Sequence, residues 1–163
     1  MTATYSPRPP IWCAGCGHFG VQAALDGALR EAGIPKQEVL ILAGIGCSGT
    51  IQNNLGTYGY HALHGRVLPA ATGAALADPT LTVIAAGGDG DGYAIGAGHL
   101  VHTFRRNPAL TYLLMNNATY GLTKGQFSAT NDKMSPSKKG EANPFDAIDL
   151  CQMAIQLGAG FVA

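Results

Sequence analysis

The chain has 163 residues with 10 basic and 10 acidic side chains, so its formal net charge is zero. This balance argues against nucleic acid or an anionic membrane as a partner, and no apolar run approaches the ~20 residues of a membrane span. Only 12% of the residues are charged, against about 25% in an average soluble domain.

A low charge content is typical of surface that is buried between subunits, so we expect partner subunits. The alternative is a compact fold rich in glycine, of which the chain has 23. The N-terminus lacks the apolar core of a signal peptide, which predicts a cytoplasmic, reducing location. There the four cysteines are better suited to metal binding or redox chemistry than to disulfides.

Helical and strand-like patterns alternate along the first half of the chain. Residues 1–16 are expected to be an extended segment that carries a C-x-x-C motif, Cys13 and Cys16. Residues 18–32 have apolar side chains at helical spacing, and residues 39–43 form a continuous apolar run of strand length. A glycine-rich loop follows, and residues 69–77 predict a helix of small side chains.

The second half continues this alternation. Strands are expected at residues 81–86, 110–115 and 160–163, helices at residues 93–106 and 144–157, a tight loop at residues 87–92, and an irregular segment at residues 121–140. Apolar strands that alternate with helices predict a single α/β domain over residues 1–163, with helices on both faces of a parallel sheet. Ligands of such a sheet bind at the carboxyl ends of its strands.

Two polar features fall at those strand ends. Asp89 lies between glycines directly after the apolar strand 81–86, and Asn117 follows the next strand, 28 positions later. A carboxylate and an amide oxygen on adjacent strand ends can hold a hard cation such as Mg²⁺, which in turn binds a diphosphate. A Gly-Asp-Gly alone could be a simple turn, but the Asn-Asn at the next strand end favours the cation site. There is no Rossmann fingerprint and no Walker lysine.

Four longer stretches of the sequence resemble a known family. Gly46-Cys47-Ser48-Gly49, the stretch from His61 to Arg66 (HALHGR), the loop at 87–92 and the stretch from Tyr120 to Gln126 (YGLTKGQ) are similar to the β subunit of 2-oxoacid:ferredoxin oxidoreductases. The resemblance covers nearly the whole chain and implies the thiamine-diphosphate-binding fold. Family β subunits are considerably longer, so we expect a chain shortened at its C-terminus.

The resemblance implies roles for individual residues. Asp89 and Asn117 would bind Mg²⁺ through their side chains, and Thr119 through its carbonyl. The residues that it implies in contact with the cofactor are Ile45, Gly46, Cys47, Ser48 and His64, with Gly90, Asp91, Gly121 and Leu122 along the diphosphate. A lone histidine such as His64 is more commonly structural, but its His-Gly-Arg context favours a cofactor role.

The cysteines are ambiguous without the resemblance, because a C-x-x-C motif suits zinc, a redox dithiol or iron–sulfur ligation. In the resembling family the matching residues, Cys13, Cys16 and Cys47, supply three ligands of a [4Fe–4S] cluster. The fourth family cysteine lies in a region that this chain lacks. Cys151, in the middle of a predicted helix with Leu, Met and Ile neighbours, is expected to be a buried apolar thiol.

The implied activity is that of a 2-oxoacid oxidoreductase. It would decarboxylate pyruvate or 2-oxoglutarate to acyl-CoA and CO₂ and pass electrons through the cluster to ferredoxin. Glu31, Glu38 and Glu141 are the only glutamates. None follows the carboxyl end of a predicted strand, and the resemblance implies that a partner α subunit supplies the glutamate that activates the cofactor. Three polar residues after the cysteine loop, Thr50, Asn53 and Asn54, are candidates for substrate contact or ordinary loop residues.

Two other interpretations stay open at this point. The chain could belong to a thiamine-dependent decarboxylase or ligase without a cluster, in which the C-x-x-C motif is incidental. It could also be a non-catalytic module whose three cysteines and one histidine bind structural zinc.

Overall fold

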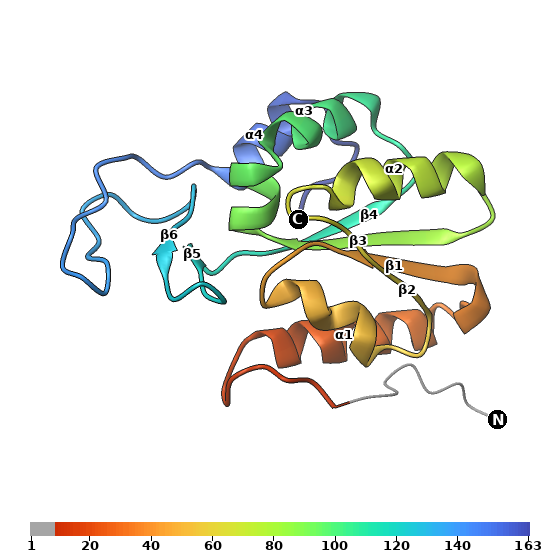
Figure 1. Ribbon diagram of the computed structural model, residues 1–163. Coiled ribbons are helices and arrows are strands. Elements are labelled where there is room, and N and C mark those ends of the chain that lie inside the picture. Colours follow the sequence, from red (N-terminus) through yellow and green to blue (C-terminus); the bar gives the residue numbers. More distant parts are fainter. Residues whose placement is uncertain (1–8) are drawn as a thin grey trace.

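The computed structural model describes residues 9–163, and a four-stranded parallel sheet lies at its centre (Figure 1). The strands are β1 (Val39–Ala43), β2 (Tyr58–His61), β3 (Thr82–Gly88) and β4 (Thr111–Met115), in the order β2-β1-β3-β4. All three pairings are parallel. The carboxyl ends of β1, β3 and β4 are in register, with Ala43 opposite Ala86 and Gly88 opposite Met115.

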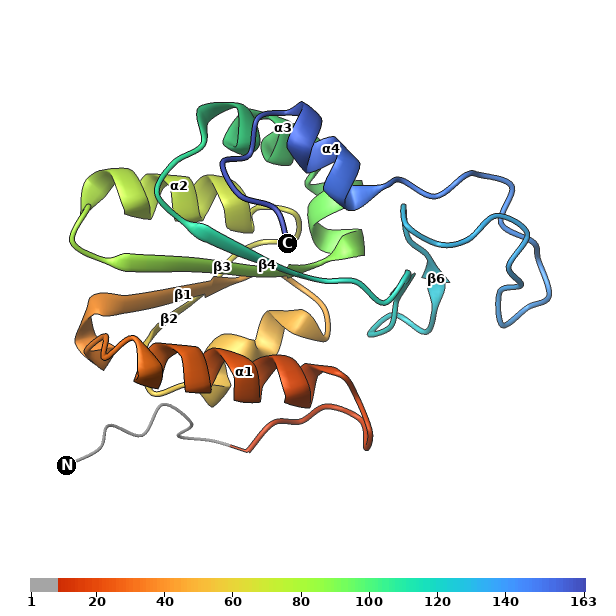
Figure 2. The same cartoon turned by 180° about the vertical axis from the view of Figure 1, so that it is seen from behind.

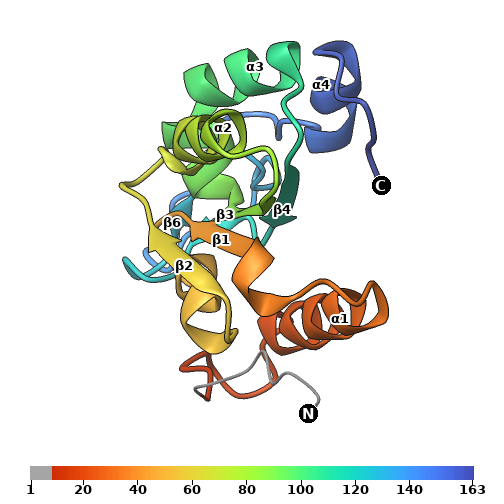
Figure 3. The ribbon, with the colours of Figure 1, turned by 90° about the vertical axis from the view of Figure 1, so that its right-hand side faces the viewer.

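Helices cover both faces of the sheet, as predicted. Helices α2 (Val67–Ala77), α3 (Ala97–Arg106) and α4 (Leu150–Gln156) lie on one face, and α1 (His18–Glu31) lies on the other (Figures 1 and 2). A short 3₁₀ helix, η2 (Ser48–Asn54), shares the face of α1, and the view along the sheet shows the layers edge-on (Figure 3). A second one, η1 (Lys36–Glu38), precedes β1.

The strand sequences build both cores because successive side chains point to opposite faces. Val39, Ile41 and Ala43 pack with Leu29 of α1, whereas Leu42 packs with Leu100 of α3. All of these side chains are buried, and full burial of a Val, Leu or Ile side chain contributes about 1.5–3 kcal/mol. The continuous apolar run at residues 39–43 therefore reflects a strand that is covered on both sides.

The predicted helix 93–106 is α-helical from Ala97 onward. The chain begins to wind directly after Asp89 as a wider π-helical turn, η3 (Gly90–Ile95), before α3 starts at Ala97. The N–H of Gly96 donates to the carbonyl of Asp91 at 2.8 Å, which is the i→i+5 bond of this turn. Wide turns of this kind occur frequently at functional sites.

The C-terminal part differs most from the prediction. The helix predicted at 144–157 begins only at Leu150, because Asn143 holds a turn against Phe145 and Asp149 caps α4 by accepting from the N–H of Gln152. The strand predicted at 160–163 is absent there, and the N–H of Gly160 donates instead to the side chain of Asn107.

Two further elements escaped the sequence patterns. Strand β2 is an exposed edge strand whose Tyr-Gly-Tyr-His sequence carries no apolar run. Strands β5 (Thr119–Tyr120) and β6 (Gln126–Phe127) form a small antiparallel hairpin at the start of the segment predicted to be irregular. The predicted extended conformation of the N-terminal segment lies outside the described residues for its first eight positions.

Candidate functional site

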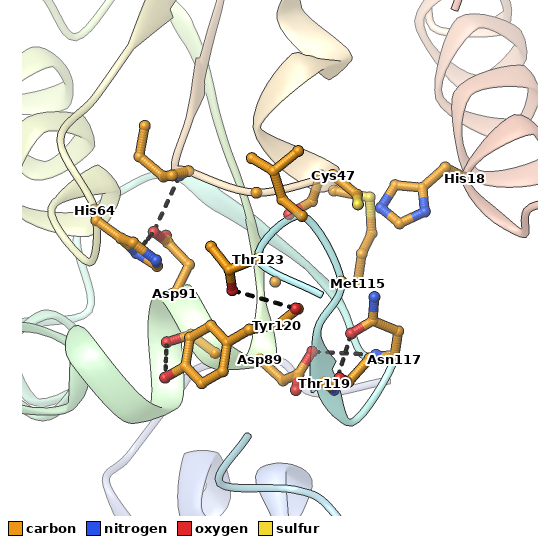
Figure 4. A pocket seen from close by; sticks show the side chains of 17 residues that line it. His18, Cys47, His64, Asp89, Asp91, Met115, Asn117, Thr119, Tyr120 and Thr123 are labelled. Carbon is orange, nitrogen blue, oxygen red and sulfur yellow. Dashed lines mark hydrogen bonds and ion pairs between the residues drawn. The ribbon is translucent and has the colours of Figure 1, made fainter. Parts of the chain in front are cut away.

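A pocket opens at the carboxyl ends of β1, β3 and β4 (Figure 4). Every residue that the sequence predicted for cofactor or magnesium binding lines it. The lining residues are His18, Ile45, Gly46, Cys47, Ser48, His64, Gly88, Asp89, Gly90, Asp91, Met115, Asn117, Thr119, Tyr120, Gly121, Leu122 and Thr123. They come together because parallel strands end at the same edge of the sheet.

Asp89 is held by two segments that follow β4. Its side chain is buried, with 1% exposure. Oδ1 accepts the N–H of Asn117 at 3.1 Å, and Oδ2 accepts the hydroxyl of Thr130 at 3.0 Å. The side-chain oxygen of Asn117 in turn accepts the N–H of Thr119 at 3.1 Å. The three predicted magnesium ligands are therefore linked to one another by direct hydrogen bonds.

Thr130 had no signal in the sequence, yet it completes this network. Its hydroxyl lies 2.8 Å from the side-chain oxygen of Asn116 and 3.1 Å from the hydroxyl of Ser128, in addition to its contact with Asp89. Thr130 and Ser128 are both buried. The segment after β6, which looks like an ordinary polar loop in the sequence, thus folds back onto the candidate cation site.

The second carboxylate of the loop, Asp91, lines the pocket and is held by the loops around it. Its side chain is wholly buried, and Oδ1 accepts the N–H groups of Ile45 at 3.1 Å and Gly65 at 2.7 Å. The Nδ1 atom of His64 lies 2.7 Å from the same oxygen. A Cβ atom at Gly44 would collide with this carboxylate, which explains the glycine at the end of β1. Asp91 therefore connects the loops after β1, β2 and β3.

Gly90 permits a close approach by Tyr120. A Cβ atom at Gly90 would lie 2.5 Å from the ring of Tyr120, whose hydroxyl donates to the Gly90 carbonyl at 3.2 Å. Burial raises the pKa of Tyr120, and the carboxylates of Asp89 and Asp91 raise it further. The phenol thus stays neutral and acts as a hydrogen-bond donor in the wall of the pocket.

The charge of the pocket fits a cation-bound anion. Two carboxylates line it, and its described lining residues include neither lysine nor arginine. A diphosphate alone would be repelled by Asp89, whereas a divalent cation would compensate both charges. The oxygens of Asp89, Asn117 and Thr119 are the hard donors that Mg²⁺ prefers. The residues present therefore fit Mg²⁺ and a diphosphate.

The cysteines are brought near the pocket but not into one cluster. Cys47 lines the pocket, and Trp12, next to Cys13, donates to the Cys47 carbonyl at 2.7 Å. The sulfur of Cys16 lies 3.1 Å from Nδ1 of His18, and burial lowers the pKa of His18. Among residues 9–163, however, no three His, Cys, Asp or Glu side chains are grouped as ligands of one metal ion. The thiolates suit an iron–sulfur cluster chemically, but the structure does not assemble them.

Two further predictions concern residues that do not line the pocket. Cys151 is exposed rather than buried, because α4 packs on the core through its other face, with Leu150, Met153 and the buried Ala154. Thr50, Asn53 and Asn54 lie in η2 and do not line the pocket.

Some residues that line the pocket were not predicted. Tyr120 and Thr123 lie inside the YGLTKGQ motif, whereas no motif included His18 or Met115. No helix in the described part is long and apolar enough to cross a membrane.

The chain is similar to proteins of known function. Residues 44–163 match the family described as "Thiamine pyrophosphate enzyme, C-terminal TPP binding domain". The chain is 43% identical over 164 residues to the 2-oxoacid:ferredoxin oxidoreductase subunit beta of a Sulfolobus species, an alignment that covers 99% of this chain and 54% of the relative. It is 42% identical over 138 residues to the 2-oxoglutarate oxidoreductase subunit KorB of Mycobacterium tuberculosis, covering 85% of this chain and 36% of that one.

A solved structure agrees with these relatives. The 2-oxoglutarate:ferredoxin oxidoreductase from Magnetococcus marinus, solved with 2-oxoglutarate, coenzyme A and succinyl-CoA bound, superposes with a TM-score of 0.93 at 40% identity. The match covers 96% of this chain and 54% of that one. The chain thus spans about half the length of the relatives that it matches.

Proposed function

The chain belongs to the thiamine pyrophosphate (thiamine diphosphate) enzymes and is homologous to the β subunits of 2-oxoacid:ferredoxin oxidoreductases, and on this basis we propose that it forms the diphosphate-binding half of such an enzyme. The enzyme oxidatively decarboxylates a 2-oxoacid, 2-oxoglutarate or pyruvate, to acyl-CoA and CO₂. Residues 1–163 act in it as a single diphosphate-binding domain.

One observation carries this proposal: the Asp89–Asn117–Thr119 network lies in a pocket whose described lining contains neither lysine nor arginine. These three residues hold Mg²⁺ through oxygen atoms, and the cation in turn binds the diphosphate. Gly90, Gly121 and Leu122 shape the wall beside the diphosphate, while Ile45, Gly46, Cys47 and Ser48 line the side toward α1. Thiamine diphosphate supplies the electron sink for decarboxylation when it is bound.

Partner subunits are part of the proposal. The three glutamates of the chain are exposed and none lines the pocket, so the glutamate that activates the cofactor comes from an α subunit that closes the site. Coenzyme A and ferredoxin act as acyl and electron acceptors of the assembled enzyme, which we place in the cytoplasm.

An iron–sulfur cluster is the finer part of the proposal. Cys13, Cys16 and Cys47 supply three thiolate ligands, with the fourth from outside this chain. The Trp12–Cys47 hydrogen bond supports this assignment, because it ties the segment with the C-x-x-C motif to the pocket loop. Because these thiolates are not grouped among the described residues, the decarboxylase or ligase without a cluster is the second candidate.

Cofactor binding tests the first part. Thiamine diphosphate is titrated into the purified enzyme that contains this chain, with and without Mg²⁺, by isothermal titration calorimetry. We expect magnesium-dependent binding that is lost in Asp89→Ala and retained in Asp146→Ala, a control at an exposed carboxylate. Equal binding by wild type and Asp89→Ala would refute the metal assignment.

The absorption spectrum of anaerobically purified enzyme tests the cluster. A broad visible band that dithionite bleaches, and that is lost in Cys47→Ala, is the expected result. A colourless enzyme that still binds thiamine diphosphate would establish the second candidate. Stoichiometric zinc without thiamine affinity would overturn both.

A further inference from the structure

The loop after β3 carries a second buried carboxylate that cation binding leaves unused. Asp91 is 2% exposed as a residue, and its side chain is fully buried. Three donors converge on Oδ1, namely the N–H groups of Ile45 and Gly65 and the ring of His64, while Oδ2 has no hydrogen-bond partner among the described residues. Oδ1 of this carboxylate is therefore directed at the protein.

The contact with His64 determines which ring nitrogen faces the pocket. Nδ1 lies 2.7 Å from a carboxylate oxygen, a distance at which Nδ1 must carry the proton, since two acceptors would repel each other. Nε2 is then the nitrogen that remains for the pocket. The imidazole is one-third exposed, lines the pocket and has the ring of Tyr120 edge-on to it.

The backbone supports this arrangement. Gly65, directly after His64, adopts a positive φ of 67° and donates its own N–H to the same Asp91 oxygen at 2.7 Å. A side chain at Gly65 would press on the backbone between Ile95 and Gly96. The His64 ring is thus fixed both through its side chain and through the turn that follows it.

We propose that Asp91 is a positioning residue, which holds His64 as an imidazolium, with Nδ1–H toward Asp91 and Nε2–H donating a hydrogen bond to an anionic oxygen of the molecule bound in the pocket. The inference rests on the proposed function, which supplies two such oxygens, on the cofactor diphosphate and on the carboxylate of the 2-oxoacid. The Asp91 carboxylate accepts from Nδ1 and compensates the positive charge of this imidazolium. The pocket's other carboxylate, Asp89, does not contact His64 in this way: it accepts hydrogen bonds from the N–H of Asn117 and the hydroxyl of Thr130.

Two substitutions of His64 test the contacts of its two ring nitrogens one at a time. In His64→Asn the side-chain amide replaces Nδ1, so the contact with Asp91 is kept and the pocket donor is lost. In His64→Gln the amide replaces Nε2, so the pocket donor is kept and the contact with Asp91 is lost. We expect ligand binding on the order of 10–100-fold weaker in His64→Asn, the range typical of ligand-orienting networks, and a smaller loss in His64→Gln. His102→Asn, at an exposed histidine of α3, is the matched control.

A double-mutant cycle tests whether Asp91 acts through His64. Asp91→Asn should weaken binding when His64 is present and add nothing when His64 is already Asn. The measurements on the complete enzyme are the affinity for thiamine diphosphate with Mg²⁺, the affinity for thiamine, and the KM of the 2-oxoacid in the loaded enzyme. Melting temperatures show whether a variant binds more weakly only because its fold is less stable.

The outcomes distinguish the two sources of the anion. A loss for thiamine diphosphate but not for thiamine assigns the contact to the diphosphate, and a raised KM at unchanged cofactor affinity assigns it to the substrate carboxylate. His64→Asn with wild-type affinity and KM would overturn the inference, as would additive losses in the cycle. If Asp91→Asn fails to fold, the two His64 variants still decide. Failure of the wild type to bind thiamine diphosphate would instead refute the proposed function.

Discussion

The indole N–H of Trp12 donates a 2.7 Å hydrogen bond to the backbone carbonyl of Cys47, 35 positions further along the chain. Trp12 directly precedes the C-x-x-C motif, and Cys47 lines the pocket. The indole also packs against His18 and Phe19 at the start of α1. This contact therefore anchors the segment before α1 to the loop after β1.

Because Trp12 is the only tryptophan, its fluorescence should report on cofactor binding. Thiamine diphosphate with Mg²⁺ is expected to change the emission saturably, since we propose that the ligand contacts the loop that accepts the indole hydrogen bond. The signal should be absent in Trp12→Phe, which also loses about 1 kcal/mol of stability with the hydrogen bond. Thiamine without the diphosphate serves as the control ligand. A saturable signal that survives in Trp12→Phe would show that another group reports the binding.

Removal of the Thr130 hydroxyl should weaken the cation site without removing a ligand. Thr130→Val keeps the shape of the side chain but leaves Oδ2 of Asp89 without its partner. We expect the Mg²⁺ concentration needed for cofactor binding to rise about 10-fold or more, as for other residues that orient metal ligands. Thr130→Ser should bind like the wild type, and so should Thr80→Val at an exposed turn. Normal magnesium dependence in Thr130→Val would show that Asp89 needs no such support.

Two glycine substitutions should change stability in opposite directions. Gly90→Ala forces a Cβ atom to 2.5 Å from the Tyr120 ring, so we expect a loss of about 1–3 kcal/mol from overpacking. Gly98→Ala, in α3 with no atom within 4 Å of the new Cβ, should stabilise by roughly 0.5–1 kcal/mol. Urea denaturation of both variants measures these changes in the free energy of unfolding. Combining Gly90→Ala with Tyr120→Ala should recover part of the loss, and additive losses would contradict the steric explanation.

Alkaline pH should destabilise the packing of α4. The hydroxyl of Tyr93 donates to the Leu150 carbonyl at 3.0 Å, and burial, with smaller contributions from Cys151 and Asp149, raises the pKa of Tyr93 to about 12. The unfolded value is about 10, so folding favours the neutral phenol. This stability is fully present below pH 10 and is lost as the pH rises toward 12.

Tyr93→Phe is expected to remove this part of the pH dependence. At pH 8 it should cost about 1 kcal/mol for the lost hydrogen bond, and between pH 10 and 12 its unfolding free energy should fall less steeply than that of the wild type. Burial also raises the pKa of Tyr112, so some alkaline dependence should persist. Tyr58→Phe, on the exposed strand β2, is the control. If the unfolding free energies of the wild type and Tyr93→Phe fell equally steeply between pH 10 and 12, Tyr93 would not be the group responsible.

Much of the sheet could be predicted because its signals are local. The apolar runs that become β1 and β3 are buried on both faces and that of β4 is half-buried, so their composition alone identified them. Strand β2 carries tyrosines and a glycine at an exposed edge, and no periodicity distinguishes such a segment from a loop. The helix predicted at 144–157 failed in its first half because Asn143 provides side-chain partners for the backbone there.

The sequence by itself determined that Asp89 and Asn117 share a site, because parallel strands bring their carboxyl ends to one edge whatever surrounds them. It could not determine where the second carboxylate of the loop points. The π-helical turn and the glycines at 44 and 65 let Oδ1 of Asp91 reach His64. Nor could it place Thr130 on Asp89, since that contact requires a polar segment to fold back over 41 positions. Local patterns record burial and turns, whereas these two contacts depend on where distant loops meet, which only the tertiary structure decides.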